Sequence, residues 1–142
     1  MLLEIGCGTG QAIEAVLFMQ PTARIAAIDR SLTAVDRSRA VNAAAIADGC
    51  VSVALCDIDE GPVEPGGFDR IFAIRVNSFW TKPGLALPNV MASLRPGGEV
   101  WIIYDESLPK TDGPILQSMR ELGLSDVRGV AGEGAYALVG RK

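Results

Sequence analysis

The sequence predicts an α/β fold in which a mostly parallel sheet carries helices on both faces. Short apolar runs alternate along the chain with segments whose apolar residues recur at helical spacing. Right-handed crossovers between parallel strands place the intervening helices above and below such a sheet. A glycine-rich turn follows the first run, and Asp29 ends the second. These two features predict a ligand site beyond the carboxyl ends of the strands.

The composition is that of one globular domain, residues 1–142. Hydrophobic residues make up 49% of the chain and charged residues 21%, which excludes a disordered protein. The net charge of −4 and the lack of a Lys/Arg cluster argue against a nucleic-acid partner. Every apolar run is shorter than the roughly 20 residues that span a bilayer, so we expect no membrane segment.

The cysteines and the absence of histidine narrow the chemistry. Cys7, Cys50 and Cys56 are odd in number and lack C-x-x-C spacing, so we expect neither a disulfide framework nor a metal site. No secretory leader is visible, and we expect a reduced, cytoplasmic protein. The chain contains no histidine, which removes the commonest general base.

The first apolar run and the turn after it carry the strongest functional signal. Residues 2–5 are typical of a buried parallel strand, and a helical pattern begins at Gln11. Between them three glycines alternate with small residues, so the backbone can adopt positive φ and bring bare N–H groups against a ligand. The dinucleotide fingerprint G-x-G-x-x-G needs its third glycine at Gln11, whereas here the third is Gly10.

The next elements follow in regular alternation. Residues 11–19 form an apolar helix that Pro21 stops. Residues 24–28 form a second buried strand that ends at Asp29, and residues 51–55 form the third.

Between these two strands the pattern predicts one helix. Ser31 can cap it, because its hydroxyl can accept a hydrogen bond from a free backbone N–H. Apolar residues keep helical spacing from Leu32 to Ala47, Asn42 falls mostly outside that stripe, and Gly49 is suited to follow the last turn.

The second half begins with a loop over residues 61–67, where prolines and glycines exclude a regular element. Residues 68–75 form the fourth strand, and residues 76–84 form a longer connection. A helix then carries Leu87, Val90 and Leu94 on one side, with Pro88 in its first turn.

The chain ends in one strand, one helix and a hairpin. The turn Arg95-Pro96-Gly97-Gly98 leads into the fifth strand, residues 99–104. A short helix follows Pro114 and stops at Gly123. The last two strands, near residues 126–130 and 135–139, flank Gly132-Glu133-Gly134 as a hairpin.

The pattern G-x-G-x-G preceded by Glu4 resembles the first motif of the class I S-adenosylmethionine-dependent methyltransferases, which have a Rossmann-like fold. Asp29, Cys56-Asp57-Ile58, Phe68-Asp69 and the stretch from Leu94 to Gly98 match later family features in the right order. The resemblance covers residues 2–140. It implies S-adenosyl-L-methionine as the cofactor and a seven-stranded sheet of order 3-2-1-4-5-7-6.

The resemblance also implies roles for the residues at the strand ends. The glycines would let the backbone approach the methionine part and ribose, and Glu4 would anchor the turn. Asp29 would accept hydrogen bonds from the ribose hydroxyls, and Asp57 one from the adenine amino group, with Ile58 against the ring. We predict the following cofactor-binding residues: Glu4, Gly6, Cys7, Gly8, Gly10, Asp29, Arg30, Cys56, Asp57, Ile58 and Arg75.

Each of these residues also has a purely structural explanation. The glycines suit a tight strand–helix turn that binds nothing. Asp29 could instead face the dipole of the following helix. Asp57 could be a solvated loop carboxylate, since Asp59 and Glu60 follow it.

The methyl acceptor is specified least. Asn77, Phe79 and Trp80 follow the fourth strand and could form one wall of an acceptor pocket, although the two aromatic residues suit the core equally well. The family's Asn-Pro-Pro-Tyr signature for amide or exocyclic-amine methylation is absent, which argues against nucleic-acid and glutamine N-methyltransferases. Tyr104 and the two acidic residues after it are weaker candidates, and we assign no catalytic base.

Three functions remain open at this stage. The first is methyl transfer to a small molecule. The second is a non-catalytic S-adenosylmethionine-binding module that completes a partner subunit. Family members usually carry one or two helices before the first strand, and here Met1 directly precedes that strand, so the site could be completed by a second subunit, as in a homodimer. The third is an NAD(P)-dependent oxidoreductase, which the glycine spacing disfavours.

Overall fold

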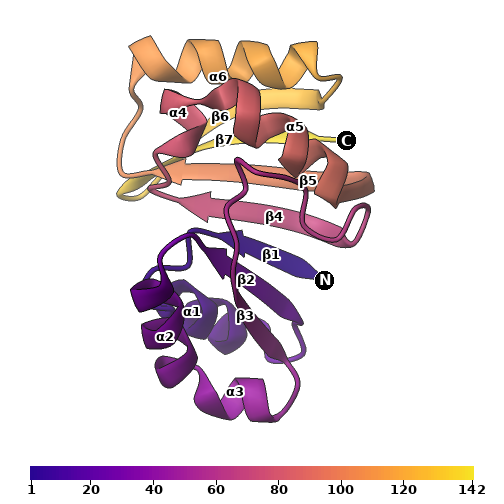
Figure 1. The fold of residues 1–142 in the computed structure, drawn as a ribbon. Helices are drawn as coiled ribbons and strands as arrows, with labels where there is room; N and C mark the ends of the chain where they lie inside the picture. The colour runs from indigo at the N-terminus through magenta and orange to yellow at the C-terminus, as the bar shows by residue number, and fades with distance from the viewer.

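The computed structural model describes residues 1–142, except for the side chain of Pro109. Its centre is a seven-stranded sheet of order β3-β2-β1-β4-β5-β7-β6, which confirms the predicted order (Figure 1). Strands β1 to β5 run parallel, whereas β7 is antiparallel to both β5 and β6. The strands are β1 (Leu2–Ile5), β2 (Ile25–Asp29), β3 (Val51–Leu55), β4 (Phe68–Ile74), β5 (Leu94–Tyr104), β6 (Ser125–Gly132) and β7 (Ala135–Arg141).

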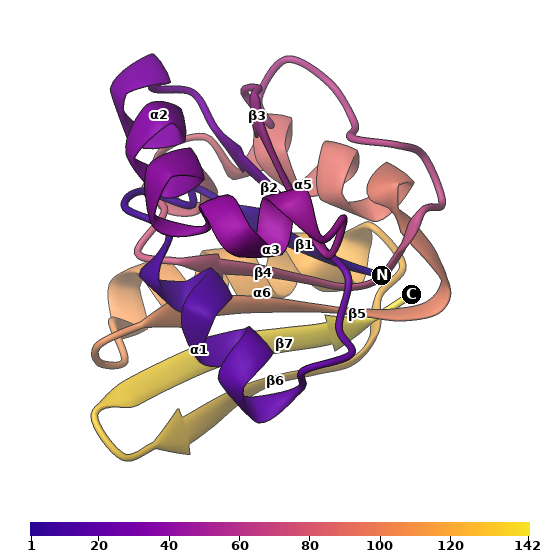
Figure 2. The ribbon, with the colours of Figure 1, turned by 90° about the horizontal axis from the view of Figure 1, so that it is seen from below.

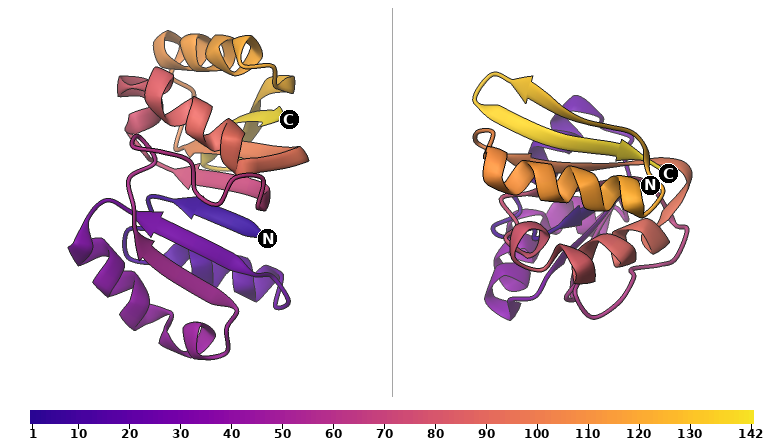
Figure 3. Two further views of the ribbon diagram at one scale, coloured as in Figure 1. Left: turned by 45° about the vertical axis from the view of Figure 1, so that its right-hand side comes forward. Right: turned by 90° about the horizontal axis from the view of Figure 1, so that it is seen from above.

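Helices cover both faces of this sheet (Figures 2 and 3). Buried side chains form a separate hydrophobic core on each face. On one face Ile13 and Val35 pack against β2 and β3. On the other, Leu87 and Met119 pack against Ile71 of β4 and against β5. The helices are α1 (Gln11–Met19), α2 (Leu32–Val41), α3 (Ala43–Ala47), α4 (Ser78–Thr81), α5 (Pro83–Ser93) and α6 (Pro109–Glu121). Among the described residues, no helix combines the length and apolarity needed to cross a membrane.

The helix predicted between β2 and β3 is in fact two helices. Ser31 caps α2 as expected, and its hydroxyl accepts a hydrogen bond from the Ala34 backbone N–H at 3.4 Å. The chain then breaks at Asn42, whose side chain turns inward and is only 4% exposed. The prediction of one continuous helix is therefore wrong: the backbone at Asn42 departs from helical values, with φ of −98° and ψ of 20°, where its side chain bonds to the Gly10 carbonyl of the glycine turn.

Two helices in the second half of the chain begin earlier than predicted, and each contains a proline in its interior. The connection predicted over residues 76–84 contains α4, and α5 begins at Pro83, so Pro88 lies inside that helix rather than in its first turn. Likewise α6 begins at Pro109 and contains Pro114. Leu87 and Val90 are almost fully buried, so packing against the sheet outweighs the local cost of the proline.

The last strands are longer than predicted. β5 begins at Leu94, through a register irregularity against Phe68 and Arg70, and so includes the predicted Arg-Pro-Gly-Gly turn. The expected hairpin is present, with Glu133 and Gly134 connecting β6 to β7. The sheet order reverses between β1 and β4, and this reversal places the crevice that matters for ligand binding.

Candidate functional site

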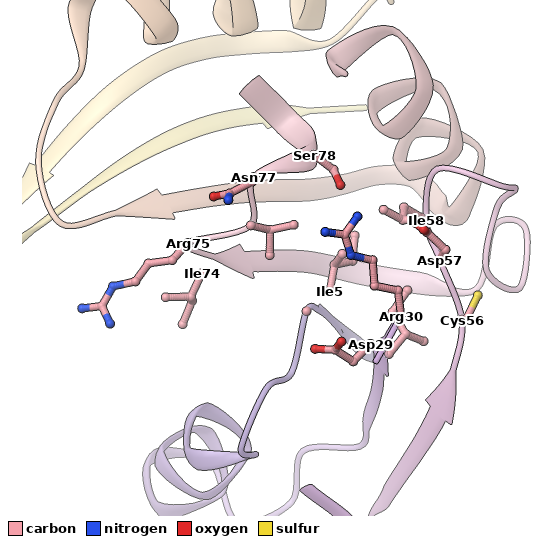
Figure 4. A pocket seen from close by; sticks show the side chains of 13 residues that line it. Ile5, Asp29, Arg30, Cys56, Asp57, Ile58, Ile74, Arg75, Asn77 and Ser78 are labelled. Atoms are coloured by element: carbon pink, nitrogen blue, oxygen red, sulfur yellow. The ribbon is translucent and has the colours of Figure 1, made fainter. Parts of the chain in front are cut away.

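A pocket of about 230 Å³ lies at the carboxyl ends of β1, β2, β3 and β4, at the point where the strand order reverses (Figure 4). Ligands of doubly wound sheets bind at such a point, because the connections diverge there and leave a crevice. Four chain segments line the pocket, each directly at the end of a strand. The lining residues are Ile5, Gly6, Ile28, Asp29, Arg30, Cys56, Asp57, Ile58, Ile74, Arg75, Val76, Asn77 and Ser78.

The glycine turn between β1 and α1 holds its shape through positive φ. Gly6 has φ of 74° and Gly10 has φ of 84°, values that residues other than glycine rarely adopt. A Cβ on Gly6 would lie 2.5 Å from Cγ2 of Val76, a pocket residue at the end of β4. The missing side chain therefore lets the ends of β1 and β4 approach each other at the floor of the pocket.

The C-terminal end of α2 fixes the same turn through Ser38 and the C-cap residue Asn42. The Asn42 side-chain amide donates to the Gly10 carbonyl at 3.1 Å and to the Ser38 carbonyl at 3.0 Å. A Cβ on Gly10 would lie 2.7 Å from the Ser38 hydroxyl oxygen, and Ser38 is fully buried. We did not predict these two residues, and the placement of Asn42 mostly outside the apolar stripe was wrong, because both are buried and follow Val35 at i+3 and i+7. Polar side chains on the apolar stripe of a helix were the available signal.

Asp29 connects the turn to the start of α2. Its Oδ2 accepts a hydrogen bond from the Gly8 backbone N–H at 3.0 Å, and its Oδ1 accepts one from Ser31 N–H at 2.9 Å. The structural explanation, a carboxylate at the helix N-terminus, therefore holds. An ionised carboxylate has about four lone-pair sites, so Asp29 keeps acceptor capacity at the pocket that it lines.

The third strand end is fixed in a similar way. Oδ1 of Asp57 accepts from the Asp59 backbone N–H at 3.0 Å. The Ile58 carbonyl accepts from the side-chain amide of Asn89 at 2.7 Å, which ties this loop to α5. Ile58 is 3% exposed and presents an apolar surface at the pocket. Asn89 is a third positioning residue that sequence reasoning missed.

Glu4 lies in β1 just before the glycine turn and does not line the pocket itself. It is 2% exposed, and its Oε2 has no hydrogen-bond partner among the described residues. Burial, with a smaller contribution from the charge of Asp29, raises the pKa of Glu4 to about 7. A carboxyl group with this pKa changes its charge near neutral pH, directly beneath the turn that approaches the ligand.

The end of β4 turns sharply at Arg75. Its φ is 57°, unusual for a side chain of this size, and its backbone N–H donates to the Ile103 carbonyl at 2.9 Å. The guanidinium Nε and Nη2 donate to Oδ1 of Asp105 at 2.8 Å and 2.6 Å. The side chain thus extends away from Asp29 and Asp57 (Figure 4).

The predicted residues separate into two sets. Of the predicted cofactor and acceptor residues, those that line the pocket are Gly6, Asp29, Arg30, Cys56, Asp57, Ile58, Arg75 and Asn77. Those that do not line it are Glu4, Cys7, Gly8, Gly10, Phe79 and Trp80. Phe79 is 0% exposed in the hydrophobic core, so its role is packing, and we leave it out of any acceptor site. Trp80 lines a second hollow beside the pocket.

The fold is an α/β domain of the doubly wound type, with a pocket at the carboxyl ends of its parallel strands. A family model described as a methyltransferase domain matches residues 3–100, from β1 through the first part of β5. The chain belongs to this family, the class I S-adenosylmethionine-dependent methyltransferases, and its cofactor is S-adenosylmethionine. No curated protein matches the chain in sequence.

Solved structures share this fold at low sequence identity. A SAM-dependent methyltransferase from Aquifex aeolicus is 17% identical to this chain, with a TM-score of 0.80. The match covers 99% of this chain and 80% of the Aquifex chain. The methyltransferase SibL in its apo form is 18% identical with a TM-score of 0.84, and the match covers 99% of this chain but only 50% of SibL. The [4+2]-cyclase SpnF is 17% identical with a TM-score of 0.80, covering 99% of this chain and 74% of SpnF. The fold alone therefore does not fix the reaction.

Proposed function

We propose that this protein transfers a methyl group from S-adenosylmethionine to a small-molecule acceptor. The observation that carries the proposal is the convergence of Gly6, Asp29 and Asp57, from three separate strand ends, on one pocket. The carboxylates of Asp29 and Asp57 suit the polar parts of an adenosyl group, and Ile58 offers an apolar surface for its base. The Gly6 backbone N–H already donates to the Ile28 carbonyl at 2.8 Å, so Gly6 contributes its lack of a side chain and not a free donor.

The residues present fit this cofactor. Gly6 lets the end of β1 lie close to Val76 at the pocket, because a Cβ there would meet the Val76 side chain. Asp29 would accept from the ribose hydroxyls, and Asp57 from the adenine amino group. Arg30 is exposed at the pocket edge, where its guanidinium can stack on a planar ring. The carboxyl end of β4, around Arg75 and Asn77, is left for the methionine part.

The chemistry asks little of the protein besides positioning. When bound, S-adenosylmethionine supplies an activated methyl carbon: an acceptor lone pair forms the new bond, the carbon–sulfur bond breaks with its electron pair left on sulfur, and the acceptor's proton passes to solvent. The pocket holds the reactants in alignment, which can contribute about 7 to 11 kcal/mol in favourable cases. Because the chain has no histidine to act as a general base, it suits best an acceptor whose hydroxyl or amine loses its proton readily or already has a free lone pair.

The test combines binding with transfer. Calorimetry with S-adenosylhomocysteine and with NADPH should show binding of the first only. Incubation with methyl-tritiated S-adenosylmethionine and a cell extract should then move the label into low-mass products that chromatography separates from S-adenosylmethionine, and an Asp29→Ala control should reduce this transfer.

Three results would contradict the proposal, each in its own way. Label in protein or nucleic acid would exclude the small-molecule acceptor. Binding without transfer into any fraction would favour the non-catalytic module. Binding of NADPH alone would exclude the cofactor.

A further inference from the structure

A second hollow of about 210 Å³ lies beside the cofactor pocket, at the carboxyl end of β5. Arg75 lines both, so the two spaces adjoin. The other residues that line the hollow are Trp80, Tyr104, Asp105, Glu106 and Leu108. Because the hollow borders the β4 end of the cofactor pocket, it is the natural place for a methyl acceptor.

Two aromatic rings dominate this hollow. The rings of Trp80 and Tyr104 stack with centroids 4.8 Å apart and planes at 5°, although they come from α4 and β5 respectively. Tyr104 is 4% exposed, and its hydroxyl donates to the Val76 carbonyl at 3.4 Å. Trp80 is only half-buried, so this stack leaves indole surface available at the hollow.

Tyr104 is held as a neutral phenol. Its burial, together with the charge of the nearby buried Asp112, raises the pKa of the Tyr104 hydroxyl well above its ordinary value. The ring therefore acts as an apolar surface and a hydrogen-bond donor, and not as a base at neutral pH.

The charges at the rim favour one kind of ligand. Arg75 is the single cation among the residues described as lining the hollow, and Asp105 already pairs with it through the contacts of 2.8 Å and 2.6 Å. Glu106 is exposed and adds a further negative charge. Because the carboxylates outnumber the cation, an anionic ligand is disfavoured and a neutral or cationic one is favoured.

We propose that this hollow binds the acceptor and that the acceptor is a planar aromatic alcohol or amine whose methylated atom is neutral and keeps a lone pair, with any positive charge on a separate side-chain amine. The inference rests on the proposed function, since it assigns the acceptor side of the same site. The size agrees: an apolar cavity of about 150 Å³ holds benzene, so about 210 Å³ holds one ring with a short side chain. A protonated amine on such a ring can also lie over Trp80.

The two tryptophans provide a direct assay. Trp101 lies on the other face of the sheet from the hollow, near Arg70. In a Trp101→Phe variant saturated with S-adenosylhomocysteine, Trp80 is the only tryptophan, and its emission reports binding beside it. Three probes separate ring from charge: tyramine, 4-hydroxyphenylacetate, and the saturated analogue trans-4-(2-aminoethyl)cyclohexanol.

Tyramine should bind about five-fold tighter than its saturated analogue, as expected for one aromatic contact. It should also bind more tightly than 4-hydroxyphenylacetate, and Glu106→Gln should reduce that second preference. A Trp80→Leu variant, followed by calorimetry, should lose the preference for the aromatic ring and keep its affinity for S-adenosylhomocysteine.

The opposite results would overturn the inference. Equal binding of tyramine and the saturated analogue would exclude aromatic recognition. Tighter binding of 4-hydroxyphenylacetate would exclude the assigned charge. In both cases unchanged affinity for S-adenosylhomocysteine leaves the proposed function standing, whereas failure to bind S-adenosylhomocysteine contradicts the proposed function itself.

Discussion

The cofactor pocket and the aromatic hollow adjoin at Arg75 but are built in different ways. Backbone conformation shapes the cofactor pocket, through positive φ at the glycines and through hydrogen bonds that the Asp29 and Asp57 carboxylates accept from backbone N–H groups. Side chains shape the hollow, namely Trp80 and Tyr104 from elements far apart in the chain. A site made from backbone tolerates little change, whereas a site made from side chains can change its ligand without changing the fold.

Gly10→Ala should produce the largest effect, because it disturbs the backbone turn on which the cofactor pocket depends. The new methyl group would meet Ser38 and Asn42 while the backbone stays at φ of 84°. We expect a loss of stability of about 3 kcal/mol, or a fall in Tm of about 10 °C. Thermal unfolding measures this change, and calorimetry should show a parallel loss of S-adenosylhomocysteine binding.

Gly8→Ala is the matched control. Its φ is 52°, but none of the described atoms lies within 4 Å of the added Cβ, so only backbone strain of about 1 kcal/mol remains. Equal losses for the two variants would mean that the contact with α2 is unimportant.

Glu4→Gln tests whether the buried carboxyl beneath the turn limits stability. The folded pKa of about 7 lies above the ordinary value of 4.5, so the folded state binds the extra proton between these values. The associated stability is present in full below pH 4.5 and is lost as the pH rises through 7, by about 3 kcal/mol in total. Urea unfolding from pH 4.5 to 8.5 should show this decline in the wild type and a nearly flat profile in the variant. A decline of the same size in both would assign it to another group.

Asp29→Ala should weaken S-adenosylhomocysteine binding by about 1.5 to 3 kcal/mol, roughly ten- to 150-fold, because charge-assisted hydrogen bonds are lost. Calorimetry measures the change. Asp36→Ala, an exposed carboxylate on α2, is the control and should bind as the wild type does. A folded Asp29→Ala variant with unchanged affinity would remove Asp29 from the site.

Asp105→Asn should have the smallest effect on stability, and it tests a side chain that lines the aromatic hollow. The Arg75–Asp105 pair is 70% and 64% exposed, so its loss should cost no more than about 0.5 kcal/mol. Asp112→Asn provides the contrast: this carboxylate is 4% exposed and accepts from Ser107 and Leu108, so its loss should cost about 2 kcal/mol. Chemical unfolding measures both losses of stability. Similar losses for the two variants would contradict the expectation that the exposed Arg75–Asp105 pair contributes little to stability.

The cofactor pocket could be predicted from sequence further than the hollow could. The glycine turn and the strand-terminal Asp29 and Asp57 are local patterns, and parallel strands bring their carboxyl ends to one edge, so the convergence of these residues was predictable. Tyr104 and Trp80 meet only because β5 lies next to β4 and α4 folds back over the same edge. No spacing in the sequence encodes their parallel stack.

The sequence by itself determined the alternation of strands and helices, the order of the sheet and the class of cofactor. The alternation follows from hydrophobic periodicity, whereas the order of the sheet and the cofactor follow from the resemblance of the local motifs to a known family. Tertiary structure decided the rest. It turned Asn42 inward and divided one predicted helix into two, placed Phe79 in the core, and assembled a hollow around Trp80. The physical reason is that burial and hydrogen bonding between distant segments outweigh local preferences of about 1 kcal/mol per residue.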